Sequence, residues 1–132
     1  MTDGKEVRNN LSYTKTHEWV QWEEKTAKVG MTDYAQEQMS ELVYAELPVV
    51  GKKYQQGEIF AQVESIKTVS AVMCPLDCEV VEINAKLVDE PMIINQSPYE
   101  QGWLAVVKPT AERPLLLDPA EYELLLKQLA QQ

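Results

Sequence analysis

The stretch from Glu58 to Asn84 constrains the fold of this chain more than any other part of the sequence. It contains three short segments rich in apolar and β-branched residues: EIFAQVES, TVSAVMC and CEVVEIN. Apolar side chains recur at every second position, which is the period of a strand with one buried face. Only Ile66 and Lys67 separate the first two segments. They therefore predict a tight β-hairpin with Lys67 at its tip.

Four further segments carry strand signals, namely β-branched and aromatic residues bounded by turn residues. They cover 13–22, 26–30, 42–47 and 102–109. Thr32 is the expected N-cap of a short helix up to Met39, and Gly51 and Gly57 mark turns. Residues 87–102 have no clear period and predict a long ordered loop with one helical turn. This pattern indicates an all-β barrel or sandwich with small added helices.

The end of the chain changes to the period of a helix. The start is typical of a capping box: Asp118 is the expected N-cap, Pro119 stands at the first helical position, and Glu121 follows three residues after the cap. Apolar side chains then follow at i, i+3, i+4 and i+7: Tyr122, Leu125, Leu126 and Leu129. This spacing predicts an amphipathic C-terminal helix that packs on the sheet.

The length of 132 residues is that of one domain. We expect a flexible lead over residues 1–12 and a single domain over 13–132, the C-terminal helix included. No apolar run approaches the roughly 20 residues of a membrane span, and the first ten residues lack the apolar segment of a secretory signal. The sequence therefore predicts a cytoplasmic protein, or one that is already processed, with no membrane partner.

The net charge of -9 and the pI near 4.6 disfavour nucleic acid as a partner. Phosphates need Lys and Arg to displace their counterions. An acidic surface fits basic protein partners, because opposite charge speeds association more than it raises affinity, which suits complexes that must form and dissociate quickly. The alternative is that the charge only aids solubility.

Lys67 is the only Lys or Arg between Lys53 and Lys86. A lysine at a hairpin tip projects into solvent from a rigid base, so a modifying enzyme can reach it and pass over the others. Five acidic residues surround it in the sequence: Glu58, Glu64, Asp77, Glu79 and Glu82. The alternative is that Lys67 is a solubilising turn residue.

Other side chains that can carry chemistry are few. His17 is the only histidine, which excludes a His-based metal cluster, and we expect a strand residue with a hydrogen-bonded ring. Cys74 and Cys78 are too few for a disulfide framework. Their CxxxC spacing allows a redox-active pair, with buried inert thiols as the alternative. No metal site is predicted.

Five blocks of this sequence, from about Tyr13 to Tyr122, resemble the glycine cleavage H-protein family. They are YTKTHEWV, VGMTDYAQEQMSELVYAELP followed by Gly51, VESIKTVS, CEVVEIN and INQSPYEQGWL before a KP pair. They occur in the order of the family. The resemblance implies a barrel-sandwich hybrid of the kind found in lipoyl and biotinyl carriers, with the C-terminal amphipathic helix added.

The resemblance also implies a cofactor. In the family, the lysine of the ES-(V/I)-K turn is acylated by lipoate, and Lys67 occupies that place in this sequence. Glu64 and Ser65 would then belong to the turn that the ligase recognises. Related biotin carriers usually hold their lysine between two methionines, and Ile66 and Thr68 are neither. Lipoate in amide linkage to Lys67 is therefore expected, rather than biotin.

A protein of this family is a carrier and not an enzyme. The resemblance implies that it takes an aminomethyl group from a pyridoxal-phosphate glycine decarboxylase to a folate-dependent aminomethyltransferase, and electrons to a dihydrolipoamide dehydrogenase. A lipoyl ligase or lipoyltransferase would load it. Tethering gives the cargo a high effective concentration near each enzyme. We expect a monomer.

In the family the loaded arm folds back into a cleft, and Thr16 and Glu18 match positions of that cavity. Ala71 is a departure, because an Asp at this place would offer a second carboxylate to the amine. Asp77-Cys78 replaces a Ser-Gly turn, which puts a side chain where there was none. These departures leave two alternatives open: an H-like lipoyl relay or regulatory protein outside glycine oxidation, and a binding module with an unmodified Lys67.

Overall fold

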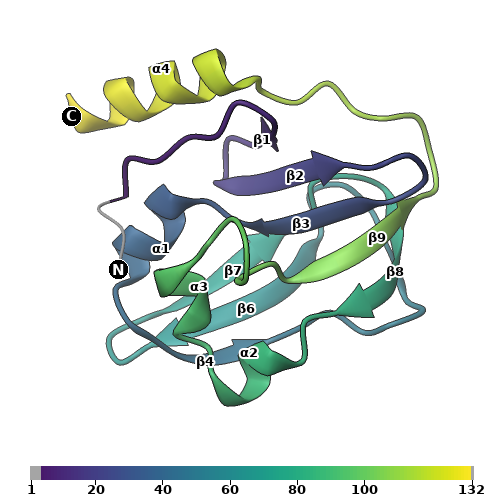
Figure 1. Cartoon of the computed structure of the whole chain (residues 1–132), viewed down its shortest axis with the longest axis horizontal. Helices are drawn as coiled ribbons and strands as arrows, with labels where there is room; N and C mark the ends of the chain where they lie inside the picture. Colours follow the sequence, from purple (N-terminus) through teal and green to yellow (C-terminus); the bar gives the residue numbers. More distant parts are fainter. Residues whose placement is uncertain (1–3, 132) are drawn as a thin grey trace.

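The computed structural model describes residues 4–131 as two antiparallel sheets with four helices around them (Figure 1). The larger sheet has the order β1-β2-β3-β9-β8-β5 and the smaller one β4-β6-β7. The large sheet consists of β1 (Ser12–Tyr13), β2 (Glu18–Trp22), β3 (Ala27–Met31), β9 (Ala105–Pro109), β8 (Cys78–Ile83) and β5 (Lys53–Tyr54). The small sheet consists of β4 (Leu42–Glu46), β6 (Ile59–Ser65) and β7 (Val69–Met73).

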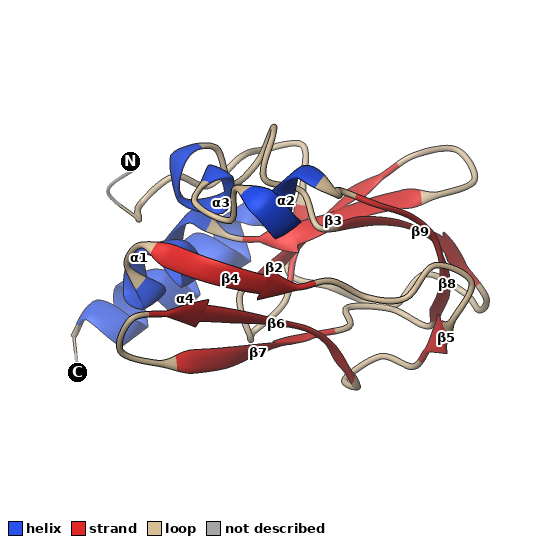
Figure 2. Cartoon of the chain, turned by 90° about the horizontal axis from the view of Figure 1, so that it is seen from below, coloured by secondary structure: helices blue, strands red, loops and turns tan. Residues whose placement is uncertain are grey.

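The core lies between the two sheets, which face each other without closing into one barrel (Figure 2). Both contribute fully buried side chains, among them Val20, Val29 and Val107 from the large sheet and Leu42, Val63 and Val72 from the small one. Burying apolar area of this kind is the main stabilising term of such a domain. The predicted all-β fold with small helices, a barrel-sandwich hybrid, is confirmed.

Four helices complete the chain: α1 (Asp33–Met39), α2 (Lys86–Asp89), α3 (Ile93–Gln96) and α4 (Pro119–Ala130). The predicted N-cap of α1 is confirmed, since the Thr32 side chain accepts a hydrogen bond from Ala35 N. The predicted start of α4 is also confirmed, with a complete capping box between Asp118 and Glu121. Within residues 4–131, no helix is long and apolar enough to cross a membrane.

Two predictions about local structure were wrong. The strand predicted over 13–22 is interrupted by a turn, because His17 takes a positive φ of 72° that a strand cannot accommodate. The loop predicted over 87–102 with one helical turn contains two short helices, α2 and α3. Each has four residues, which is too short to show a helical period in the sequence.

The Trp19 ring explains why the neighbouring strand β3 contains a glycine, Gly30. Trp19 pairs with Gly30 across β2 and β3, and its side chain is fully buried. A Cβ on Gly30 would lie 2.5 Å from ring atoms of Trp19. The ring therefore occupies the space that a side chain at position 30 would need. This close packing holds Trp19 in place at the centre of the second, smaller core cluster.

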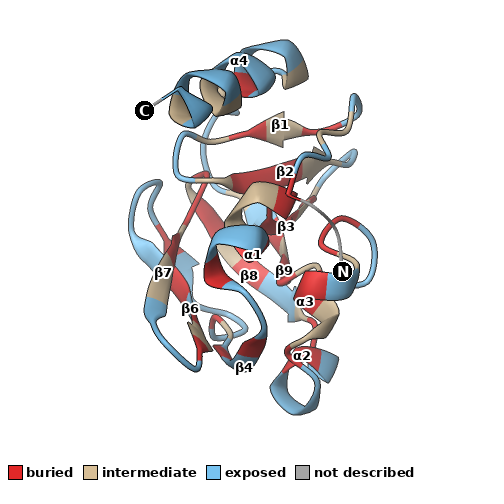
Figure 3. Ribbon diagram, turned by 90° about the vertical axis from the view of Figure 1, so that its left-hand side faces the viewer, coloured by how far each residue is buried: buried red, intermediate tan, exposed pale blue. Residues whose placement is uncertain are grey.

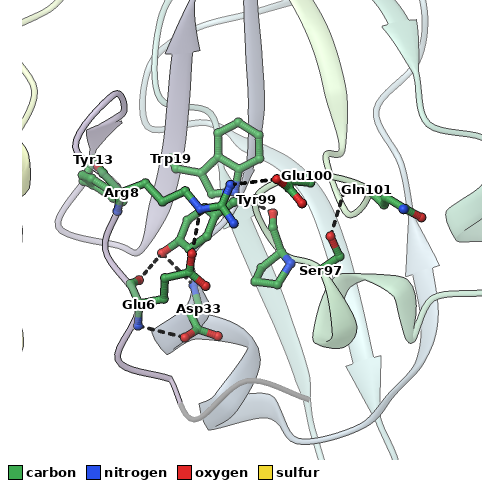
Figure 4. Close-up of polar contacts among 10 residues, drawn as sticks. Glu6, Arg8, Tyr13, Trp19, Asp33, Ser97, Tyr99, Glu100 and Gln101 are labelled. Carbon is green, nitrogen blue, oxygen red and sulfur yellow. Dashed lines mark hydrogen bonds and ion pairs between the residues drawn. The ribbon is translucent and has the colours of Figure 1, made fainter.

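The segment before β1 packs on the domain (Figure 4). Glu6 N donates to Asp33 Oδ2 at 2.9 Å, and Tyr99 Oη donates to the Glu6 carbonyl at 2.6 Å. Arg8 N donates to Tyr13 Oη at 2.7 Å. The expected flexible lead over 1–12 and the domain over 13–132 stay predictions, with residues 1–3 outside the described part. The structure adds that residues 4–12 are tied to α1 and to β1.

Candidate functional site

Lys67 lies in the turn between β6 and β7 and is exposed. Ser65 N donates to the Thr68 carbonyl at 2.9 Å, which closes the hairpin around Ile66 and Lys67. The strands then continue in register, with Glu64 opposite Val69. A regular ladder of this kind holds the turn in one place while its side chains stay in solvent. The structure thus gives Lys67 the position that the alternation of the sequence predicts.

The two residues before Ile66 differ in their accessibility. Glu64 is partly exposed, whereas Ser65 is buried with 6% of its surface exposed. Successive residues of a strand point to opposite faces, so only one of the two can face an approaching enzyme. Recognition of both by a ligase stays a prediction. In the structure, Ser65 contributes to the turn through its backbone N–H, which closes the hairpin.

A cavity of about 140 Å³ lies beside this hairpin. It is bounded by the turn before β2, by α1 and by β7, and it brings together Thr16, Glu18 and Ala71. Figures 1 and 2 place α1 and the β6–β7 turn at the same end of the molecule. The strand that forms one wall of the cavity, β7, begins two residues after Lys67, and Ala71 follows the lysine by four residues.

Glu18 is the acidic group of this cavity and is almost fully buried. Its Oε1 accepts from Thr14 Oγ1 at 2.6 Å and from Thr16 Oγ1 at 2.5 Å, and its Oε2 accepts from Met73 N at 3.2 Å. Burial raises the pKa of Glu18, and the three hydrogen bonds oppose part of that rise. The carboxylate thus links β2 of the large sheet to β7 of the small one.

His17 forms part of the cavity wall and is held by the C-terminal helix. Its Nδ1 lies 2.8 Å from Tyr122 Oη, which also lies 2.7 Å from Thr32 Oγ1. The expected hydrogen-bonded ring is present, but His17 lies in a turn and not in a strand. Burial lowers the pKa of His17, so the neutral ring is favoured.

Sequence reasoning missed the role of Tyr122 beside this cavity. The amphipathic pattern identifies Tyr122 only as an apolar anchor of α4, and its ring does stack on Tyr13 with centroids 4.4 Å apart. The hydroxyl bonds to Thr32 and His17 were not predicted. The one available signal is that a tyrosine, rather than a leucine, stands at the first buried position of the helix, since buried tyrosines usually find a partner for the hydroxyl.

The family model described as Glycine cleavage H-protein matches residues 11–129. The chain belongs to this family. It is 45% identical to the glycine cleavage system H protein of Brevibacillus brevis over 125 residues, which cover 93% of this chain and 99% of that protein. It is 46% identical to the probable glycine cleavage system H protein of Pyrococcus furiosus, over 93% of this chain and 94% of the relative.

A solved structure agrees with this assignment. The crystal structure of a glycine cleavage system H protein from Mycobacterium marinum is similar, with a TM-score of 0.85 and 36% identity. The similarity covers 94% of this chain and 99% of that one. As a glycine cleavage H-protein, the chain is a non-catalytic carrier component rather than an enzyme.

This glycine cleavage H-protein also contains two buried thiols in contact. Cys74 Sγ and Cys78 Sγ are 3.5 Å apart, and neither is bonded in a disulfide. The hydrogen bond to Cys74 and burial raise the pKa of Cys78 well above its ordinary range, which keeps that thiol protonated. Cys78 begins β8 without a positive φ, so the side chain introduced at this turn causes no backbone strain. Within residues 4–131, no group of His, Cys, Asp and Glu side chains is arranged to hold a metal ion.

Proposed function

We propose that Lys67 carries lipoate through an amide bond and that the protein shuttles cargo between the enzymes of glycine cleavage. The observation that carries this proposal is the position of Lys67, exposed at the tip of the β6–β7 hairpin in a chain of the glycine cleavage H-protein family. The hairpin offers one lysine and no competing cation between Lys53 and Lys86. A ligase that reads this turn therefore has a single target.

When bound, the lipoyl group supplies a disulfide and dithiol pair that holds an aminomethyl group and electrons. The proposed partners are a pyridoxal-phosphate glycine decarboxylase, an aminomethyltransferase and a dihydrolipoamide dehydrogenase. The protein contributes a rigid base for the arm, so that its end samples a small volume near each docked enzyme. The monomeric state and the cytoplasmic location stay predictions.

We propose that Thr16 and Glu18 form the resting place of the loaded arm. One wall of the cavity that they line is β7, which begins two residues after Lys67, and Glu18 offers a carboxylate to an amine. A nearby ammonium group would favour the ionised form of Glu18, whose pKa is raised by burial. Ala71 adds no second carboxylate, so Glu18 provides the ionic contact alone.

The lipoyl proposal is tested by intact mass after incubation with lipoate, ATP and a lipoyl ligase. We expect one mass increment on the wild-type chain and none on Lys67→Arg, which keeps the charge but not the nucleophile. An absent increment on the wild type, or one that persists in the variant, would refute lipoylation at Lys67.

A second candidate function is that of an H-like lipoyl relay or regulatory lipoyl protein outside glycine oxidation. Ala71 favours it, because it leaves the cavity wall without a second carboxylate beside Glu18. The two functions are separated by assaying the lipoylated protein for glycine-dependent bicarbonate exchange with the cognate decarboxylase. Exchange supports the glycine role, and its absence with a lipoylated carrier leaves the relay role.

A further inference from the structure

Parts of the small sheet are exposed, as the pale blue segments of its strands show (Figure 3). Large apolar side chains near Lys67 in the sequence and across the strands are among these exposed residues. The exposed fractions are 86% for Ile66, 58% for Val69, 50% for Val43 and 49% for Tyr44. We call these four residues the hairpin patch. Tyr44, Glu64 and Val69 are register partners across β4, β6 and β7, so they form one row of the sheet. Ile66 directly precedes the lysine.

A β-bulge in β4 turns Tyr44 of the hairpin patch to the exposed face of the sheet, beside Val43. The register shifts between Leu42, which pairs with Ser65, and Tyr44, which pairs with Glu64. Regular alternation from the buried Leu42 would turn Tyr44 inward, whereas the extra residue Val43 leaves both Val43 and Tyr44 exposed. Bulges commonly re-aim side chains next to functional sites. The exposure therefore follows from a specific backbone irregularity.

The charge around the hairpin patch is of one sign apart from Lys67. The three strands and the β6–β7 turn contain no other Lys or Arg, while Glu46 and Glu64 lie on the same strands and Glu41 directly precedes β4. An apolar centre with an acidic margin fits a partner that presents an apolar depression with Lys or Arg at its rim.

We propose that the hairpin patch is the docking surface for the enzyme that acylates Lys67, a partner with a basic rim around an apolar depression. This inference rests on the proposed function. In the step, Lys67 Nζ attacks the carbonyl carbon of lipoyl adenylate, the N–C bond forms, the C–O bond to AMP breaks, and the amine proton passes to solvent. The enzyme must enclose Nζ itself, so it must also contact the residues beside it.

The test compares acylation kinetics of purified variants with a lipoyl ligase, lipoate and ATP. Val69→Thr and Tyr44→Thr remove exposed apolar surface from the hairpin patch and keep strand-forming residues. Val81→Thr is the matched control, an exposed strand valine of β8 in the large sheet with 43% exposure. We expect the KM of the variant that carries both substitutions to rise about tenfold, the change expected when the binding energy of one or two such buried side chains is lost. The KM of the control should stay within about twofold of wild type.

Thermal unfolding of each variant shows that it is folded, and at these exposed positions we expect unchanged midpoints. Equal KM values for the patch variants and the Val81→Thr control, with a wild type that is acylated, would overturn the docking surface alone. A wild type that is not acylated would overturn the lipoyl function and the docking surface with it. A rise in KM confined to the patch variants supports the proposal.

Discussion

The β6–β7 hairpin and the cavity beside it are built in opposite ways. The hairpin comes from one short run of sequence, closed by a backbone bond between Ser65 and Thr68, and its side chains are mostly exposed. The cavity is assembled from the turn before β2, from α1 and from β7, and α4 holds one wall through Tyr122. The proposed attachment point thus lies on a local element, whereas the proposed resting place of the arm depends on segments far apart in the sequence.

This difference predicts where substitutions act. A change at the hairpin alters recognition and leaves the fold intact, because few buried contacts depend on those side chains. A change at the cavity alters stability and the environment of Glu18 together, because its side chains also join the two sheets. The predictions below probe that contrast.

The largest expected effect is that of Tyr122→Phe, on the cavity side. The substitution keeps the ring stacked on Tyr13 but removes the hydroxyl that bonds to Thr32 and His17 in the interior. We expect a loss of about 2 kcal/mol in the free energy of unfolding, measured by urea denaturation, since the buried Thr32 hydroxyl and the half-buried His17 ring each lose a partner.

Tyr44→Phe is the matched control for this change, because Tyr44 lies on the outer sheet face and is half-exposed. We expect its unfolding free energy to stay within about 0.5 kcal/mol of wild type, as is usual at surface positions. Similar losses for the two variants would contradict the contrast between hairpin side and cavity.

Glu18→Gln should have an intermediate effect on the loaded carrier. Glutamine keeps the shape of the side chain and removes its charge, so the ionic contact to an amine is lost. We expect release of the amine from the loaded carrier to become about tenfold faster, equivalent to about 1.4 kcal/mol. Glu46→Gln, an exposed acid of β4, is the control. An unchanged release rate would remove Glu18 from the proposed cavity.

The same variant has a readout that does not need the arm. Burial raises the pKa of Glu18 above its ordinary value of 4.5 in the folded protein. Between the unfolded and folded pKa values the folded state binds more protons, so this group makes the protein less stable as pH rises through that window. Glu18→Gln removes this contribution. The unfolding free energy of Glu18→Gln minus that of the wild type should therefore increase as the pH rises above about 4.5.

Glu64→Lys should have the smallest effect, on the hairpin side. It places a like charge near Lys67 and reverses the acidic margin of the hairpin patch. We expect acylation to slow about threefold, equivalent to about 0.7 kcal/mol at a surface site, with unchanged unfolding free energy. Glu82→Lys makes the same charge change on the exposed surface of β8. Equal slowing by both variants would show that net charge, rather than the hairpin, is recognised.

The hairpin could be predicted from the sequence because all its determinants are local. The alternation along the two segments that form β6 and β7, with only Ile66 and Lys67 between the predicted strands, suffices to place Lys67 in the turn. The N-cap residue Thr32 likewise predicted α1, and the capping box and apolar spacing predicted α4. The hairpin patch could not be predicted in the same way, because the bulge at Val43 changes the facing of β4 without any sign in its residue types.

The cavity could be predicted only in part. Family resemblance brought Thr16 and Glu18 together, but the interruption of the strand at His17 was missed because its neighbours are aromatic and β-branched. A positive φ at a residue other than glycine is imposed by its tertiary contacts and leaves little trace in composition. The bonds from Tyr122 join residues about a hundred positions apart, which no local pattern can show.

The isolation of Lys67 has a practical consequence for measuring how much of the protein is loaded. Trypsin cleaves after unmodified Lys and Arg, so the free protein yields separate peptides covering 54–67 and 68–86. Acylation of Lys67 removes this cleavage site and leaves a single peptide over 54–86. The ratio of the joined peptide to the two fragments would therefore report occupancy directly, even in a digest of whole cells.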